Sequence, residues 1–177
     1  MLTRRTIIQS LGLLAASTLL GSAKSAFAVP HHKDVWFMPD ESDPHKRTWM
    51  AFSASKKVWG KKLLPEVQRN LATIALTIAQ YEPVSMLVRP ADLRLAQKLM
   101  GSKVELITCP LDDLWMRDSG PVFVVTENGD KAGVDFNFNG WGEKQAFEQD
   151  AKIAALVTQR AGVRRIQSEL ILEGGGI

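Results

Sequence analysis

The chain has few residues that could form covalent or metal cross-links. Its 177 residues include one cysteine, Cys109, and three histidines, His31, His32 and His45. A single cysteine excludes an internal disulfide, so the folded state must depend on a hydrophobic core. The histidines lack cysteine partners and lack the spacing that places two ligands on one helix face. The sequence therefore predicts no zinc site, and we expect no metal and no cofactor.

Long hydrophobic runs are also absent. The most apolar stretch, residues 11–20, is interrupted by polar residues such as Ser17 and is too short to cross a bilayer comfortably. A twin arginine, Arg4-Arg5, precedes it, and small residues at 26–28 suit cleavage. We expect residues 1–28 to be a twin-arginine (Tat) signal peptide rather than a transmembrane anchor. The mature chain would then be periplasmic or secreted, with no stable membrane anchor.

An excess of charge is missing once this leader is set aside. Arg4, Arg5 and Lys24 are the only charged residues before residue 29, and the rest of the chain has 19 basic and 19 acidic side chains. The basic residues are scattered and form no stripe with aromatic residues between them. We therefore predict no nucleic acid as a partner.

The hydrophobic pattern after residue 29 alternates between strands and helices. Apolar runs predict strands over 47–53, 84–88, 103–108, 122–126, 132–138 and 165–172. A stripe of Val67, Leu71, Ile74 and Ile78 predicts a helix with Pro65 in its first turn, after a loop over 56–62. Shorter helices are expected over 91–100, closed by Gly101, and over 147–156.

This order indicates an α/β or α+β chain without a clean linker, so residues 29–177 are expected to belong to one domain. Asn128-Gly129 between two strand patterns predicts a hairpin turn. Cys109 follows an apolar strand, and we interpret it as a small buried residue rather than a catalytic thiol.

Residues 115–121, Trp-Met-Arg-Asp-Ser-Gly-Pro, combine an aromatic plane, a carboxylate and a chain-turning Gly-Pro pair. A planar guanidinium ion binds well to a carboxylate that accepts two N–H bonds and to an aromatic face. Core packing of Trp115 and an ordinary ion pair between Arg117 and Asp118 remain the alternative interpretation.

Four segments together favour the guanidinium interpretation, because they resemble the agmatine deiminase and bacterial (Porphyromonas-type) peptidylarginine deiminase family in order and approximate spacing. They are residues 38–51 (with Met38-Pro39-Asp40-Glu41-Ser42 and Thr48-Trp49-Met50-Ala51), 110–121, 133–142 and 172–177 (Leu-Glu-Gly-Gly-Gly-Ile). The resemblance covers nearly everything after residue 37. It identifies the chain as similar to the N-terminal part of this family.

The resemblance implies a pentein fold, in which repeated ββαβ units surround a pseudo-fivefold axis and a central channel holds the active site. This chain would supply about the first half of that propeller. Residue by residue, the resemblance assigns Asp118 to a clamp on the substrate amidino group. Glu173 would be a second acidic contact or a support for the catalytic histidine.

Three further residues are weaker candidates for binding substrate: Trp115 and Trp141 as pocket walls, and Asp113 as an acidic contact. Asp112 could cap the turn or add to the negative field. Arg117 is better suited to organising the loop, because it would repel a cationic substrate. In the family the histidine and the nucleophilic cysteine come later in the chain, and we do not transfer the cysteine's role to Cys109.

The predicted function is therefore that of a guanidino deiminase in its full-length form. Agmatine would become N-carbamoylputrescine and ammonia, or peptidylarginine would become peptidylcitrulline, through attack by a thiolate. The partner would be agmatine or an arginine-containing peptide, and a homo-oligomer of the full-length form stays open. By itself the chain is predicted to be inactive. The alternatives are a guanidinium-binding fragment without catalysis and an unstable truncated product.

Overall fold

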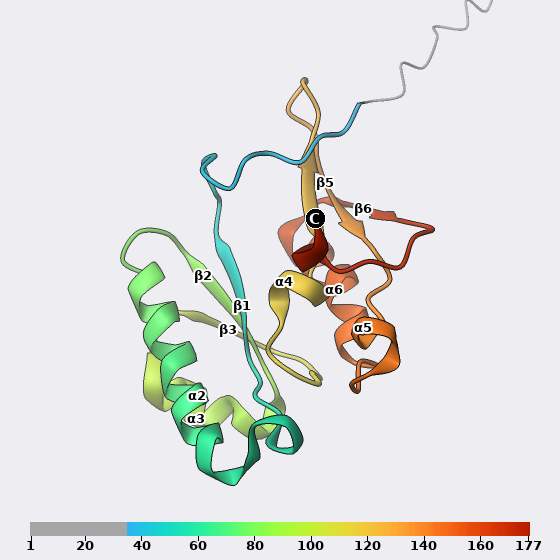
Figure 1. Ribbon diagram of the computed structural model, residues 1–177. Coiled ribbons are helices and arrows are strands. Elements are labelled where there is room, and N and C mark those ends of the chain that lie inside the picture. The colour runs from blue at the N-terminus through green and yellow to red at the C-terminus, as the bar shows by residue number, and fades with distance from the viewer. Residues whose placement is uncertain (1–34) are drawn as a thin grey trace, which may run out of the picture. The chain divides into compact units, whose positions relative to one another are not determined.

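The structure is a computed structural model that describes residues 35–177 (Figure 1). The predicted signal peptide, His31 and His32 lie outside the described residues. Within residues 35–177, the helices include none with the length and apolar character needed to span a membrane.

Residues 35–177 form two three-stranded sheets, each associated with helices. The elements before the second sheet are β1 (Thr48–Phe52), α2 (Lys56–Ile78), β2 (Val84–Val88), η1 (Pro90–Asp92), α3 (Leu93–Met100), β3 (Glu105–Thr108) and α4 (Met116–Ser119). Those that follow are β4 (Val122–Val125), β5 (Lys131–Asp135), α5 (Gly140–Glu143), η2 (Asp150–Lys152), α6 (Ile153–Ala161), β6 (Arg164–Gln167) and η3 (Gly174–Gly176). The predicted alternation of strands and helices is confirmed.

The first sheet has the order β1-β2-β3 with all strands parallel, and β2 lies at its centre. Successive side chains of a strand point to opposite faces. Phe52 and Met86 therefore belong to one core with α2 and α3, whereas Ala51 and Leu87 belong to a second core with α6. Burial on both faces explains why the β2 sequence is continuously apolar rather than alternating.

The loop predicted over residues 56–62 is wrong, because α2 begins at Lys56. Ser55 caps this end by accepting a hydrogen bond from the Lys57 N–H at 3.3 Å. Gly60 then interrupts the helix with φ +68° and ψ 175°, a conformation that glycine adopts at low cost. Because α2 already begins at Lys56, Pro65 lies inside the helix rather than in its first turn.

The buried face of α2 is rotated from the predicted stripe. Gln68, Ala72 and Ala75 are its buried residues, whereas Ile74 is 49% exposed. Small residues face the sheet, so the helix can lie close to β1 and β2. The apolar spacing predicted the helix correctly, and Leu71 and Ile78 of the predicted stripe do pack against the first core, but Ile74 faces solvent.

The second sheet has the order β4-β5-β6, with β4 antiparallel to β5 and β6 parallel to β5. The hairpin is confirmed, and Gly129 in its turn has φ +86°. With α6 between β5 and β6, this region follows the expected ββαβ order. The first sheet instead follows a βαβαβ order.

Both strands of the β5–β6 pair are shorter than predicted. β5 ends at Asp135 because Asn137 adopts φ +55° and turns the chain. β6 ends at Gln167, after which the Asn137 side-chain amide donates to the carbonyls of Ser168 at 2.7 Å and Leu170 at 3.0 Å. These side-chain hydrogen bonds supplement two backbone ones past the strand ends, from the Ser168 N–H to the Asp135 carbonyl and from the Leu172 N–H to the Phe136 carbonyl.

Gly133 of β5 allows α6 to approach the second sheet closely. A Cβ atom at this position would collide with the Thr158 methyl group of α6 and lie 2.9 Å from Pro121 Cβ. The absence of a side chain at Gly133 thus allows the close approach of α6, the helix that packs on both sheets.

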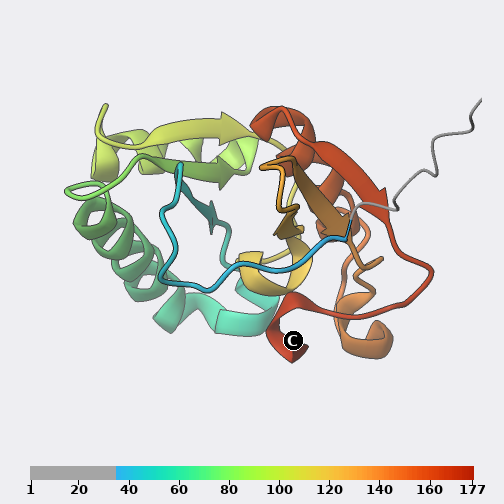
Figure 2. The ribbon, with the colours of Figure 1, turned by 90° about the horizontal axis from the view of Figure 1, so that it is seen from above.

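The segment before β1 connects the two sheets. Phe37 and Val125 exchange backbone hydrogen bonds of 3.0 and 2.9 Å at the end of β4. The chain then crosses from the second sheet to β1, a path that Figure 2 shows from above. Backbone hydrogen bonds thus connect the segment before β1 to β4, although Phe37 and Val125 are far apart in the sequence.

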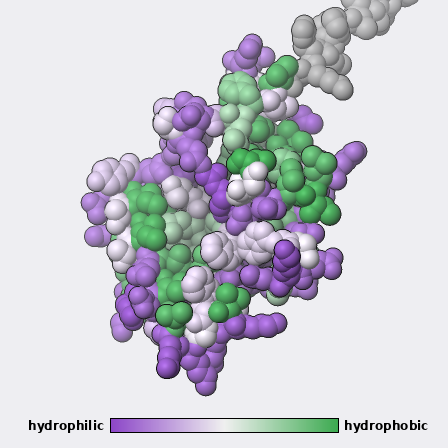
Figure 3. Space-filling model, in the orientation of Figure 1, coloured by the Kyte–Doolittle hydropathy of each residue, from purple (hydrophilic) through white to green (hydrophobic). Residues whose placement is uncertain are grey.

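Apolar side chains remain exposed near the C-terminal end of the chain. Leu170 and Ile171 are each 60% exposed, and Ile177 is 53% exposed. Figure 3 shows apolar surface on the side where the segment after β6 runs. The segment after β6 and the last residue thus leave large apolar side chains in solvent.

Candidate functional site

The motif predicted to bind guanidinium forms the short helix α4. The Trp115 carbonyl accepts hydrogen bonds from the Asp118 N–H at 3.1 Å and the Ser119 N–H at 3.0 Å. Gly120 ends the helix, and Pro121 leads into β4. Trp115 and Asp118 thus lie one turn apart on a rigid turn between the two sheets, with the C-terminal residues packed against it (Figure 1).

Close packing of glycines brings Glu173 to Asp118 across 55 positions of sequence. A Cβ atom on Gly174 would collide with the Arg117 carbonyl oxygen, and one on Gly175 would collide with Asp118 Oδ1. Only residues without side chains fit there. Gly174 and Gly175 therefore dock on α4 and carry Glu173 with them.

The Asp118 carboxyl group has a raised pKa, and burial is the main cause. The negative charge of Glu173 raises it further, whereas the Gly175 N–H, which donates to the carboxylate, and the charge of Arg117 lower it. Two carboxylates held this close repel each other, and a bound cation would relieve that repulsion.

Asp113 lies behind the site rather than in it. Its side chain is buried, with 5% of the residue exposed. Oδ1 accepts hydrogen bonds from the Ser55 N–H at 3.1 Å and Trp59 Nε1 at 3.3 Å, and Oδ2 accepts one from Trp115 Nε1 at 3.1 Å. Direct substrate contact by Asp113 stays a prediction, but the geometry gives this carboxylate the role of holding two indole rings.

Four aromatic rings form a connected group around Trp115. Trp59 stacks on Trp115 with centroids 6.3 Å apart, and Trp141 meets Trp115 edge to face at 6.2 Å. Phe138 in turn packs edge to face on Trp141 at 5.0 Å. Trp115 remains 38% exposed, so one part of this aromatic group is open to a ligand.

The loop that presents Trp141 has an uncommon backbone. Asn137, Trp141 and Glu143 all have positive φ values, of 55°, 58° and 62°. Such conformations are unfavourable for residues other than glycine and persist where the surroundings enforce them. The Asn139 side chain supports the loop by accepting the Gly142 N–H at 2.9 Å. Backbone strain of this kind often accompanies functional sites.

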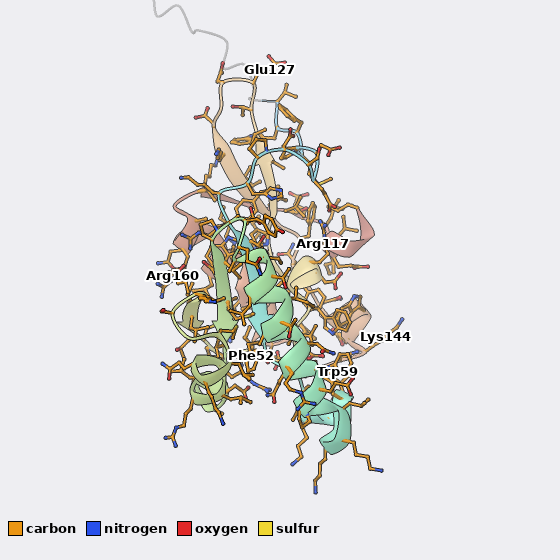
Figure 4. The ribbon with its side chains drawn as sticks, turned by 90° about the vertical axis from the view of Figure 1, so that its left-hand side faces the viewer. Phe52, Trp59, Arg117, Glu127, Lys144 and Arg160 are labelled. Atoms are coloured by element: carbon orange, nitrogen blue, oxygen red, sulfur yellow. The ribbon has the colours of Figure 1, made fainter. Side chains whose placement is uncertain are left out.

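A hollow of about 250 Å³ lies beside Trp115 and Arg117. Its other walls come from β1, α2 and the residues just before α4. Arg117 turns to Glu41 of the segment before β1 and forms an ion pair with it, which agrees with a role in organising the loop. Figure 4 shows Trp59 and Arg117 along one side of the molecule and Arg160 on the other.

A second pair of aspartates connects the turn before α4 to the start of α6. The Asp150 carboxylate accepts the N–H groups of Asp112 at 2.8 Å and Asp113 at 3.0 Å. The Asp112 carboxylate in turn accepts the N–H groups of Gln149 at 2.7 Å and Asp150 at 3.3 Å. Asp112 thus caps the helical turn that starts at Asp150.

The described residues offer no ready nucleophile. Cys109 is 9% exposed, and burial, followed by the negative charge of Asp150, raises the pKa of its thiol. A thiol in such surroundings is inert. His45 lies away from α4 and pairs with Glu82 at 3.4 Å. Among residues 35–177, His, Cys, Asp and Glu form no group suited to a metal ion.

Three residues that shape the site were not predicted from sequence: Trp59, Asn137 and Asp150. Ser55 before Lys56 was an available N-cap signal that could have placed Trp59 on a helix. Asp150 at the head of a helical pattern suggests a cap, but its partners are 37 and 38 positions away. No local pattern reports a contact at that separation.

Comparison with known proteins agrees with this geometry. The family described as Porphyromonas-type peptidyl-arginine deiminase matches residues 37–177. A Streptomyces avermitilis protein, assigned by its name to the agmatine deiminases, is 40% identical over 147 residues. That match covers 81% of this chain and 42% of the relative. The agmatine deiminase of Ectopseudomonas mendocina is 34% identical over 151 residues, covering 81% of this chain and 41% of the relative.

The solved agmatine deiminase of Enterococcus faecalis superposes with a TM-score of 0.74 at 27% identity, covering 79% of this chain and 40% of that one. The expected pentein fold is confirmed for the part that this chain spans. The chain thus spans about two fifths of the length of the relatives it matches. With the family description matching 141 consecutive residues, from 37 to 177, the chain belongs to the Porphyromonas-type peptidyl-arginine deiminase family, which includes the agmatine deiminases.

Proposed function

We propose that this chain is the N-terminal portion of a guanidino deiminase and carries the acidic, guanidinium-holding part of its active site. The convergence of Asp118 and Glu173 beside the exposed ring of Trp115 supports this function. Two carboxylates and an aromatic face are what a flat, weakly hydrated cation requires. Holding the guanidinium carbon in place would supply the positioning part of catalysis.

Charge at the site favours a cation over an anion. The nearest positive group is Arg117, and its ion pair with Glu41 offsets its charge. The raised pKa of Asp118 has a functional consequence, because a bound guanidinium would favour the ionised carboxylate. Binding should therefore weaken as the pH falls, beginning above the ordinary titration range of an aspartate.

Agmatine is the proposed substrate. The relatives named above support it, since they carry the name agmatine deiminase. The deiminase reaction would convert agmatine to N-carbamoylputrescine and ammonia, as in putrescine biosynthesis. Peptidylarginine, the substrate in the family's name, is the competing candidate.

We further propose that these 177 residues alone bind the substrate without turning it over. Covalent catalysis needs a thiolate, and the one cysteine in the sequence is buried with a raised thiol pKa. By the resemblance, the nucleophilic cysteine of family members does not correspond to Cys109. The fragment would then be a guanidinium-binding half of a site.

Calorimetry with agmatine and with an arginine-containing peptide tests both proposals. We expect heat with agmatine, a loss of affinity of about tenfold or more in Asp118→Asn, and no ammonia release. Asp130→Asn, at an exposed aspartate in the hairpin turn, is the matched control and should bind normally. If neither ligand produces heat, the proposal that the chain binds substrate is wrong. If ammonia is released, the proposal that the chain does not turn substrate over is wrong.

Export is proposed on the leader's sequence alone. Residues 1–28 would direct the folded chain through the Tat pathway to the periplasm or the outside. A fused reporter should remain in the cytoplasm when Arg4 and Arg5 are both changed to Lys. Unchanged export would reject the Tat proposal.

An unstable product is the second candidate, favoured by the exposed Leu170, Ile171 and Ile177. These side chains would normally need a covering surface. A soluble monomer with one cooperative thermal transition would argue against instability. Aggregation or a broad, non-cooperative transition would support it.

A further inference from the structure

The reciprocal contact between Asp112 and Asp150 is the most completely bonded polar group outside the candidate site. Each carboxylate accepts two backbone N–H groups from the other segment, at distances from 2.7 to 3.3 Å. Asp150 is 3% exposed. Burying a carboxylate costs free energy unless its oxygens accept hydrogen bonds. Here both oxygens of Asp150 accept one, which offsets that cost.

The contact connects the two sheets at the point where the site begins. Asp112 follows β3 of the first sheet, and Asp150 starts the helical turn that leads into α6 of the second. Because α6 packs on both sheets, the turn η2 that leads directly into it, and that begins at Asp150, is a well-supported anchor. The turn at residues 112–113 has no strand or helix of its own to hold it.

From this turn, hydrogen bonds lead directly to the site. Asp150 holds the Asp113 N–H, and the Asp113 carboxylate holds the indole N–H groups of Trp59 and Trp115. The Trp115 carbonyl then accepts the N–H of Asp118. Every step is a contact between neighbours, so a displacement of the turn should reach both the aromatic group and α4.

We propose that Asp150 is a positioning residue for the candidate guanidinium site, acting through the Asp113 turn on the ring of Trp115 and on α4. It touches no substrate itself. The inference rests on the proposed function for what is being positioned, but the geometry that it predicts can be measured without any ligand.

The test is the near-ultraviolet circular dichroism of Asp150→Asn in the 177-residue chain. An asparagine offers one acceptor oxygen in place of two, so one of the N–H groups of residues 112 and 113 loses its partner. We expect the tryptophan signal of the stacked Trp59–Trp115 pair to fall by about half or more, because its strength depends on fixed ring geometry. Asp130→Asn, exposed and distant in the hairpin turn, is the matched control and should keep the parental spectrum.

A Trp115→Phe background separates positioning from general loosening. If Asp150 acts through Trp115, adding Asp150→Asn to Trp115→Phe should cause little further change, and the two effects will not add. Equal spectral loss in both backgrounds would overturn the proposal, as would an unchanged spectrum in the single variant. Should Asp150→Asn fail to fold by far-ultraviolet dichroism, Asp112→Asn disrupts the other half of the same contact and is judged by the same two criteria.

These outcomes can be distinguished from a failure of the proposed function. Agmatine binding that is absent in the parent chain would reject the guanidinium site while leaving the spectral test intact. Conversely, normal agmatine binding with an unchanged Asp150→Asn spectrum would reject the positioning role alone.

Discussion

The two sheets differ in how completely they are covered. The central strand of the first sheet, β2, is buried at every position, between α2 and α3 on one face and α6 on the other. In β6 of the second sheet, three of four residues are exposed and only Ile166 is partly buried. The segment after β6 also leaves Leu170 and Ile171 in solvent.

The two sheets therefore contribute differently, the first mainly to stability and the second mainly to the candidate site. The first sheet holds most of the hydrophobic core, whereas the site depends on segments around the less covered sheet: α4, the Trp141 loop and the Glu173 turn. Elements with few buried contacts open at lower free energy than core strands. The site is thus assembled on the part of the described chain that is least protected.

The largest expected effect compares a core residue in each sheet. Phe52 of β1 is fully buried in the core with α2 and α3, so Phe52→Ala should lower the free energy of unfolding by about 3–5 kcal/mol. Ile166→Ala in β6 removes a partly buried side chain and should cost about 1 kcal/mol. Urea unfolding of both variants measures the contrast, and equal losses would contradict it.

An intermediate effect concerns the docking of the C-terminal turn. Gly174→Ala would place a methyl group against the Arg117 carbonyl and push Glu173 away from Asp118. Overpacking of this kind costs about 1–3 kcal/mol, so the Gly175 amide should exchange its hydrogen roughly tenfold to a hundredfold faster.

Gly176→Ala is the control for this experiment. Its added Cβ would lie 3.4 Å from the nearest atom, Glu173 Oε1, which belongs to a flexible side chain. Exchange at Gly175 should therefore stay near the parental rate. If both variants behave alike, the turn is not held by close glycine packing.

A third effect, visible only as a change with pH, concerns the contact that joins the two sheets. Burial, the main cause, raises the pKa of Asp150 to about 6 from 3.8, and the charges of Asp112 and Asp113 contribute. Between these pH values the folded chain binds the proton more tightly than the unfolded chain does. Stability from this group is therefore greatest below about pH 4, falls as the pH rises to about 6, and is level above it.

Thermal unfolding across pH 4–7 checks this prediction by difference. Other carboxyl groups titrate in the same range, so the parental chain is compared with Asp150→Asn. The difference between their melting temperatures should change between pH 4 and 6 and stay constant above. Parallel curves would mean that Asp150 titrates normally in the folded chain.

Local patterns predicted most of the elements and failed at their edges. β2, the hairpin and the helix ending before Gly101 follow from apolar runs and turn residues that act within a few positions. The predicted α2 stripe is only partly buried, because Leu71 and Ile78 pack against the core whereas the larger Ile74 stays in solvent and the small Ala72 and Ala75 take the buried positions. Strand ends at Asp135 and Gln167 depend on Asn137, whose side-chain amide donates to carbonyls 31 and 33 positions away.

The sequence by itself determined the order of strands and helices and the family, because these are written in residue types and spacing. Only the tertiary structure decided that Asp113 turns inward to hold two tryptophans, that Trp59 joins the aromatic group, and that Asp150 supports the turn behind it. These roles depend on which N–H groups, of the backbone and of the indole rings, need an acceptor once the sheets have packed. That is a property of the folded arrangement and not of any local segment.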